Sequence, residues 1–99
     1  ACNLRKADLR GARLTGARLS GSDMRECRMG PLMIAADRLL PADLSGAQLK
    51  TVDLSGADLT RAILRDTDLT RAVFLGAQLK NADLTGAVRT GTRGLALFN

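Results

Sequence analysis

This chain lacks histidine and has very few aromatic side chains. The 99 residues contain no histidine and no tryptophan or tyrosine, and their only aromatic side chains are Phe74 and Phe98. Histidine is the commonest general base and metal ligand, so its absence argues against catalysis and metal binding. The scarcity of aromatics means that a core must be filled by many small, equivalent leucine and alanine side chains.

Cysteine is nearly as scarce, because Cys2 and Cys27 are the only two. They are too few for a disulfide scaffold, and without histidine they do not make a zinc site. No glycine-rich nucleotide-binding loop occurs. We therefore expect no catalytic residue, no metal, no cofactor and no enzymatic activity, and we assign both cysteines to packing.

Long apolar runs are missing as well. No segment approaches the roughly 20 apolar residues of a membrane-spanning helix, and no secretory signal is visible. We expect a cytoplasmic location. The sequence opens inside a repeat, which would suit one domain of a longer protein, and we expect residues 1–99 to form a single domain.

What the chain does contain is a repeat of five residues. A large apolar residue, here called the centre, recurs at every fifth position. The centres are Leu4, Leu9, Leu14, Leu19, Met24 and Met29, then Leu44, Leu49, Leu54, Leu59, Leu64, Leu69, Phe74, Leu79 and Leu84. A small residue stands two positions before each centre. Apolar positions two apart share one face of an extended segment, and the glycines that follow indicate corners.

Units such as Ala7-Asp8-Leu9, Ala57-Asp58-Leu59 and Ala82-Asp83-Leu84 resemble the pentapeptide repeat family of bacterial proteins. The resemblance covers roughly residues 2–89. It implies an all-β fold, a right-handed quadrilateral parallel β-helix of about four coils, in which four units make one coil. It also implies that centres and small residues point inward, while the other three positions of each unit face solvent. Physically, each coil buries its core only against its neighbours.

Residues 30–41 interrupt the repeat between a first block, 1–29, and a second block, 42–88. The interruption keeps the five-residue phase, so Ile34 and Leu39 fall on centre positions, but Asp37 would then be an unpaired inward charge. The coil either continues here in distorted form or extrudes a loop or short helix, and we favour extrusion. The segment is a candidate functional loop or simply a tolerated insertion.

The C-terminal residues 89–99 also depart from the repeat, because Arg89 and Gly94 fall on centre positions. We expect the coil to end near Ala87. The apolar residues Leu95, Leu97 and Phe98 then either cap the last coil or, as in some members of the family, form a homodimer.

Surface charge and outward apolar residues supply the remaining candidates for partner binding. The net charge is +5, and residues 1–30 carry seven basic residues against three acidic ones. Arg5 and Arg25 should stack on successive coils, as a binding edge or merely as a solvated face. The aspartates before the centres are interpreted as turn residues. Four apolar residues stand at outward positions, and they either form a partner-binding patch or are only scattered: Ile63, Val73, Leu75 and Val88.

Three functions remain open. The leading hypothesis is a non-catalytic scaffold or protein-interaction module, with an unidentified protein partner. The alternative is a DNA-mimicking protein that interacts with gyrase and gives quinolone resistance, as some family members do, but the +5 charge argues against it. The third is salt-sensitive contact with nucleic acid or anionic membrane through the N-terminal arginines. Without interleaved aromatic residues we expect no specific nucleic-acid recognition.

Overall fold

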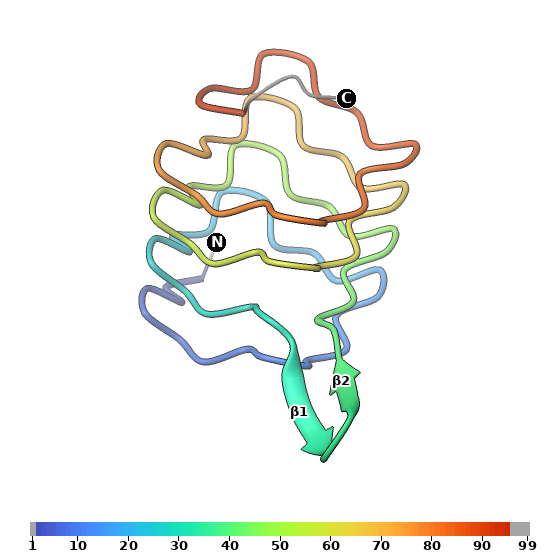
Figure 1. Cartoon of the computed structure of the whole chain (residues 1–99). Coiled ribbons are helices and arrows are strands. Elements are labelled where there is room, and N and C mark those ends of the chain that lie inside the picture. The colour runs from blue at the N-terminus through green and yellow to red at the C-terminus, as the bar shows by residue number, and fades with distance from the viewer. Residues whose placement is uncertain (1, 96–99) are drawn as a thin grey trace.

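The computed structural model describes residues 2–95, which wind into a right-handed parallel β-helix with four-sided coils (Figure 1). Each coil pairs with the next through short parallel bridges at the residue before each centre. These residues form four columns, one for each face. Face 1 holds Asn3, Asp23, Asp53, Val73 and Arg93; face 2 holds Asp8, Arg28, Asp58 and Gln78; face 3 holds Arg13, Asp43, Ile63 and Asp83; and face 4 holds Arg18, Gln48, Asp68 and Val88.

The corners between faces all use the same backbone conformation. The residue two positions after a centre has a positive φ, whether it is a glycine such as Gly11 (φ 69°) or a side-chain-bearing residue such as Arg61 (φ 60°). A hydrogen bond closes each turn, as between the Ala7 amide and the Leu4 carbonyl at 3.0 Å. Glycine takes this conformation freely, whereas other residues are strained in it. Thr51 (φ 56°) is the most strained type, because it is β-branched.

Proline at one corner explains why the repeat is interrupted. Pro31 stands two positions after Met29, where the coil needs a positive φ, but the proline ring fixes φ near −65°. The chain therefore leaves the coil between faces 2 and 3. Bridged residues are 20 apart elsewhere on face 3, but Arg13 pairs with Asp43, 30 residues on, so that ten residues lie outside the coil.

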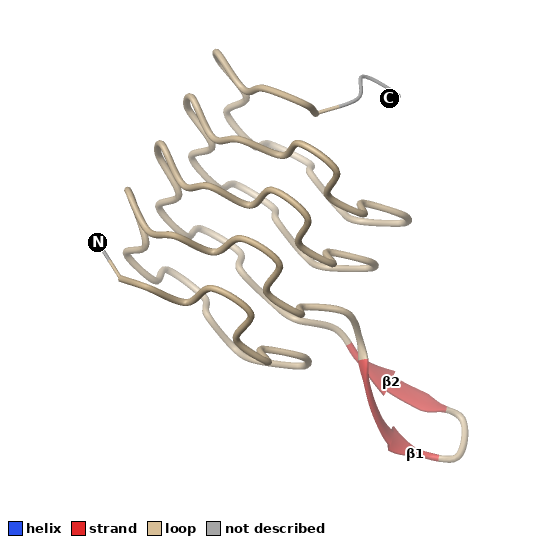
Figure 2. Ribbon diagram, turned by 90° about the vertical axis from the view of Figure 1, so that its left-hand side faces the viewer, coloured by secondary structure: helices blue, strands red, loops and turns tan. Residues whose placement is uncertain are grey.

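These extra residues form an antiparallel β-hairpin of strands β1 (Leu32–Ala35) and β2 (Arg38–Leu40). The hairpin projects beyond the corner of the stack (Figure 2). The segment is thus extruded, but the expectation of a loop or short helix is wrong. Residues pair across the two strands, Leu32 with Leu40 and Met33 with Leu39, and these cross-strand pairs favour a sheet. Asp37 is exposed in the hairpin turn, so no charge enters the core.

The core lies in the middle coils. Their centres are fully buried, from Met24 to Phe74, while the centres of the first and last coils, such as Leu4 and Leu84, are only partly buried. Two buried hydroxyls sit at the small inward positions and are satisfied: Thr67 Oγ1 donates to the Leu64 carbonyl at 2.9 Å, and Ser22 Oγ accepts from the Cys2 amide at 3.0 Å. Residues 2–95 contain no helix, and hence none that could cross a membrane.

The C-terminal end of the coil lies beyond the expected Ala87. Val88 and Arg93 both bridge to the preceding coil, and the Phe74 amide donates to the Arg93 carbonyl at 2.7 Å. The expectation failed because backbone pairing needs no large apolar residue at positions 89 and 94. Leu95 packs against the edge of the core, whereas Leu97 and Phe98, the rest of the expected cap or dimer contact, lie outside the described residues.

Candidate functional site

The basic residues of the N-terminal segment do not form one surface. Arg10 binds the Asp8 carboxylate through two hydrogen bonds of 2.9 and 2.8 Å, and Arg25 binds Asp23 in the same way at 2.8 and 2.7 Å. The arginines without such a partner are distributed over different faces, as Arg13 on face 3 shows. This arrangement offers no continuous cationic strip to a nucleic acid or a membrane.

Arg5 and Arg25 do lie on successive coils, because the Lys6 amide donates to the Arg25 carbonyl at 2.9 Å. Arg25 is already engaged by Asp23 and lies 4.0 Å from Asp53, so its charge is largely compensated. The column continues with Ser55 and then Leu75 rather than with a third cation, because the hairpin shifts the register of all later residues. A binding role for Arg5 and Arg25 stays a prediction.

The aspartates before the centres serve the turns. In seven units with the same geometry, one carboxylate oxygen accepts the amide two residues later at 2.9–3.2 Å; these aspartates are Asp8, Asp23, Asp43, Asp53, Asp58, Asp68 and Asp83. Hydrogen bonds from the Arg25 side chain and amide lower the pKa of Asp23 to about 2. Among residues 2–95 no acidic or cysteine cluster could hold a metal ion. These carboxylates are structural acceptors.

The four outward apolar residues do not come together. Val73 and Leu75 share face 1 and its corner, Ile63 lies on face 3 and Val88 on face 4. Leu75 and Val88 are exposed, and Val73 and Ile63 are half-buried. A single partner patch built from all four is therefore wrong. The reason is their spacing, because Val73, Leu75 and Val88 lie 10, 12 and 25 residues after Ile63, and none of these offsets is a whole 20-residue coil.

The largest concentration of exposed apolar side chains is the hairpin itself. Seven large apolar residues are exposed in the described chain, and five belong to it: Leu32, Met33, Ile34, Leu39 and Leu40. Met33 is 67% exposed, the highest value of the set. Exposed apolar clusters on a small protein mark contact sites more often than scattered single residues do. The sequence marked this segment and its apolar residues as candidates, but it did not single out these five side chains, although their density between two prolines was a usable signal.

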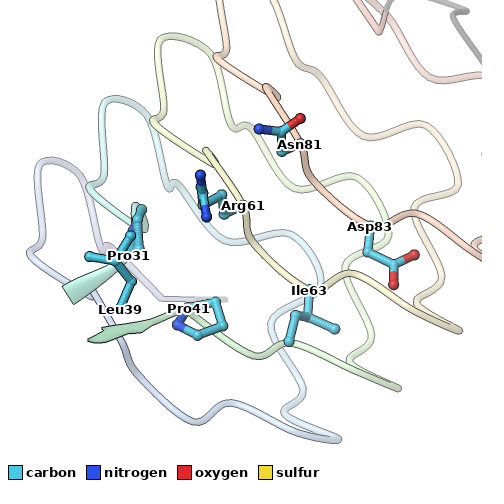
Figure 3. Close-up of a pocket in the computed structure, with 7 residues that line it drawn as sticks. All are labelled: Pro31, Leu39, Pro41, Arg61, Ile63, Asn81 and Asp83. Atoms are coloured by element: carbon cyan, nitrogen blue, oxygen red, sulfur yellow. The ribbon is translucent and has the colours of Figure 1, made fainter. Parts of the chain in front are cut away.

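The two faces of the hairpin have different surroundings. Leu32 pairs with Leu40, and Met33 with Leu39, so these two pairs lie on opposite faces. Leu32 and Leu40 pack over the corner of the first coil at Gly11. Leu39 instead faces a groove of about 460 Å³ between the hairpin base and the third and fourth coils (Figure 3).

This groove combines an apolar floor with a polar rim. The floor is formed by Leu39, Ile63 and the prolines Pro31 and Pro41, and the rim by Arg61, Asn81 and Asp83. Arg61 and Asn81 occupy the same corner on successive coils, where both have a φ of 60°. Ile63 is thus the one outward apolar candidate that joins the hairpin surface. The groove is the size of a small-ligand or peptide site.

Comparison with known families supports the fold. The model of pentapeptide repeats matches residues 1–30 and 53–88 in eight copies. The unmatched stretch between them contains the hairpin. Comparison with curated proteins gives no significant match.

Two solved structures are closely similar. HetL, a pentapeptide repeat protein involved in heterocyst differentiation regulation from the cyanobacterium Nostoc sp. strain PCC 7120, shares 45% identity over 86% of this chain, with a TM-score of 0.81. This chain spans about a third (35%) of HetL. A second pentapeptide repeat protein of Nostoc shares 31% identity over 98% of this chain and 77% of its own, with a TM-score of 0.74.

Proposed function

The chain belongs to the pentapeptide repeat family, and we propose that it is a non-catalytic interaction module that binds a protein partner through its hairpin. The observation that carries this proposal is the exposed apolar surface of β1 and β2. Five of the seven exposed large apolar residues lie there, outside a coil that buries its own centres. An isolated two-stranded hairpin is only marginally stable in water, so a partner that covers it would stabilise both.

The coil supports this role as a rigid base. Its corners and carboxylates are occupied by local hydrogen bonds, and its stacked coils stabilise one another. HetL takes part in the regulation of differentiation, and the 45% identity makes a regulatory contact a better analogy for this chain than a reaction. We propose a location in the cytoplasm.

The DNA-mimic alternative has less support. A mimic of duplex DNA needs an acidic surface, whereas this chain carries +5 and alternates charges within its columns, as Asp8, Arg28 and Asp58 do on face 2. A gyrase supercoiling assay with a fluoroquinolone tests it. Protection of the enzyme by this chain would revive the alternative.

Site-specific photo-crosslinking in living cells tests the interaction proposal. A benzophenone amino acid replaces Met33, and in a matched control it replaces Gln48, which is exposed on face 4. We expect a discrete protein adduct from position 33 that is absent from position 48. The same adducts from both positions, or none from position 33, would refute a hairpin-mediated contact.

A further inference from the structure

We propose that the groove between β2 and the third and fourth coils binds an extended segment of a partner protein that carries a large apolar side chain next to a carboxylate. This inference rests on the proposed function and names the chemistry of its partner. It concerns the groove face of the hairpin, not the Leu32–Leu40 face, which already packs on the first coil at Gly11.

The floor of the groove sets the apolar part of the ligand. Leu39 is 44% exposed and its cross-strand partner Met33 is 67% exposed, so the apolar surface of this face is not used within the chain. Ile63 extends it onto face 3, and Pro31 and Pro41 line it beside Leu39 with rings that offer no backbone N–H (Figure 3). A leucine- or phenylalanine-sized side chain would be dehydrated on contact with this floor, which is the main source of favourable free energy in such sites.

The rim sets the charge of the ligand. Asp83 is already engaged, because its Oδ1 accepts the Thr85 amide at 3.0 Å and the Thr85 hydroxyl at 2.6 Å, and its Oδ2 lies 3.8 Å from Arg65 Nε. Arg61 has no carboxylate oxygen within 4.0 Å in the described chain, and neither has Lys80, whose carbonyl accepts the Arg61 amide at 2.8 Å. The uncompensated charge beside the apolar floor is therefore positive.

The charge of the whole chain acts in the same direction. A net charge of +5 steers acidic partners toward the protein and opposes close approach of a second copy. The extended form of the ligand follows from the hairpin. Within the described residues the strands pair only with each other, which leaves outer strand edges where a partner segment can add by main-chain hydrogen bonds.

Peptide selection on the purified chain tests the proposal directly. A random 12-residue phage library is selected against the wild-type chain, and clones that also bind the Leu39→Asp variant are removed. We expect the enriched peptides to share an apolar residue within one or two positions of an aspartate or glutamate. Enrichment of no sequence, or of sequences without an acidic residue, would overturn the proposal.

The chain offers a matched pair of charge reversals for the selected peptides. Arg61 and Arg71 are both exposed arginines with a φ of 60° on the third coil, but only Arg61 lines the groove. Arg61→Glu should raise the peptide Kd roughly tenfold or more, as loss of a charge-assisted contact does, and a peptide with lysine in place of its acid should bind this variant better. Arg71→Glu should change the Kd far less, because it alters only the net charge.

The outcomes separate this inference from the function on which it rests. If Arg61→Glu and Arg71→Glu weaken binding equally, the groove assignment is wrong, even if photo-crosslinking at Met33 still identifies a partner. If the wild-type chain forms a dimer in sedimentation equilibrium that Leu39→Asp dissociates, the occupant is a second copy and the proposal is wrong. If the wild-type chain binds anionic phosphatidylglycerol vesicles and Leu39→Asp abolishes this binding, the ligand is a membrane surface and not a peptide, and the proposal is likewise wrong.

Discussion

Leu32 occupies the space that a side chain on Gly11 would need. A Cβ atom placed on Gly11 would lie 2.9 Å from the Cβ of Leu32 and 3.4 Å from a methyl group of Leu40. This contact joins two segments that come from different coils, and it fixes the base of the hairpin against the first coil. It also gives the hairpin a defined orientation, which a binding surface requires.

Gly11→Ala should therefore destabilise the protein more than Gly16→Ala. Both glycines have a φ of 69°, so the backbone strain of roughly 1 kcal/mol is shared. Nothing lies within 4 Å of a Cβ on Gly16, whereas the clash at Gly11 involves a Cβ that cannot rotate away. Overpacking of this kind adds about 1–3 kcal/mol.

Urea unfolding of the two variants measures the difference. NMR chemical shifts of the hairpin amides should move in Gly11→Ala and stay in place in Gly16→Ala. Equal losses of stability with unchanged hairpin shifts would mean that Leu32 does not pack on this corner.

Thr51→Gly should stabilise the coil. Thr51 is a β-branched residue held at a φ of 56°, and its hydroxyl only donates to the Lys50 carbonyl beside it. The left-handed conformation costs a residue with a side chain about 1–2 kcal/mol. Glycine avoids this cost but loses more conformational entropy on folding, which offsets part of the gain. We expect a gain of roughly 0.5–1 kcal/mol in the free energy of unfolding. In the control Thr15→Gly, where φ is not positive, stability should fall, and a gain in both variants would argue against strain at this corner.

Asp23 should titrate far below the usual range. Hydrogen bonds from Arg25 lower its pKa from 3.8 to about 2. Because the folded pKa is the lower one, the stabilisation from this pair is fully present above pH 4 and is lost as the pH falls from 4 to 2. The carboxyl carbon shift of Asp23, followed by NMR, should show a midpoint near 2, and Arg25→Gln should move it upward. A midpoint near 3.8 in the wild-type chain would show that the pair does not form in solution.

The two cysteines should differ in reactivity. Burial raises the pKa of the Cys27 thiol to about 11, and this side chain is inaccessible, whereas Cys2 is exposed. Since the thiolate is the reactive form, iodoacetamide at pH 8 should modify Cys2 alone in the native chain and both residues in denaturant. Rapid labelling of Cys27 in the native chain would mean that the second coil opens readily.

Most of the fold could be predicted from the sequence because the repeat is a local rule. Each centre, from Leu4 to Leu84, enters the core for the same steric reason, so fifteen repetitions fix the architecture. The hairpin could not be derived in the same way. Pro31 indicates where the coil must break, but the strand pairing of residues 32–40 depends on cross-strand contacts that the five-residue pattern does not encode.

The candidate site was predicted only in part, because one side of the groove is formed by the hairpin. Ile63 belongs to the groove because it lies one coil after Asp43, on the face where the chain returns from the hairpin to the coil. Val73, Leu75 and Val88 are separated from Ile63 by 10, 12 and 25 residues, which are not whole 20-residue coils, so they face other directions. Arg61 was missed because it occupies a corner position, where a lone charge is ordinarily solvated.

Removal of the hairpin should leave the coil intact, and this deletion is the most direct test. Replacement of residues 31–41 by one glycine restores the 20-residue spacing of face 3 and supplies the residue that the corner conformation requires. The measurement is the affinity of this variant for the partner that photo-crosslinking at position 33 identifies, compared with the affinity of the wild-type chain. Circular dichroism checks that the two chains are folded to the same extent. We expect a folded coil that melts at or above the wild-type temperature and no longer binds. A folded variant that binds with wild-type affinity would contradict the assignment of function to the hairpin.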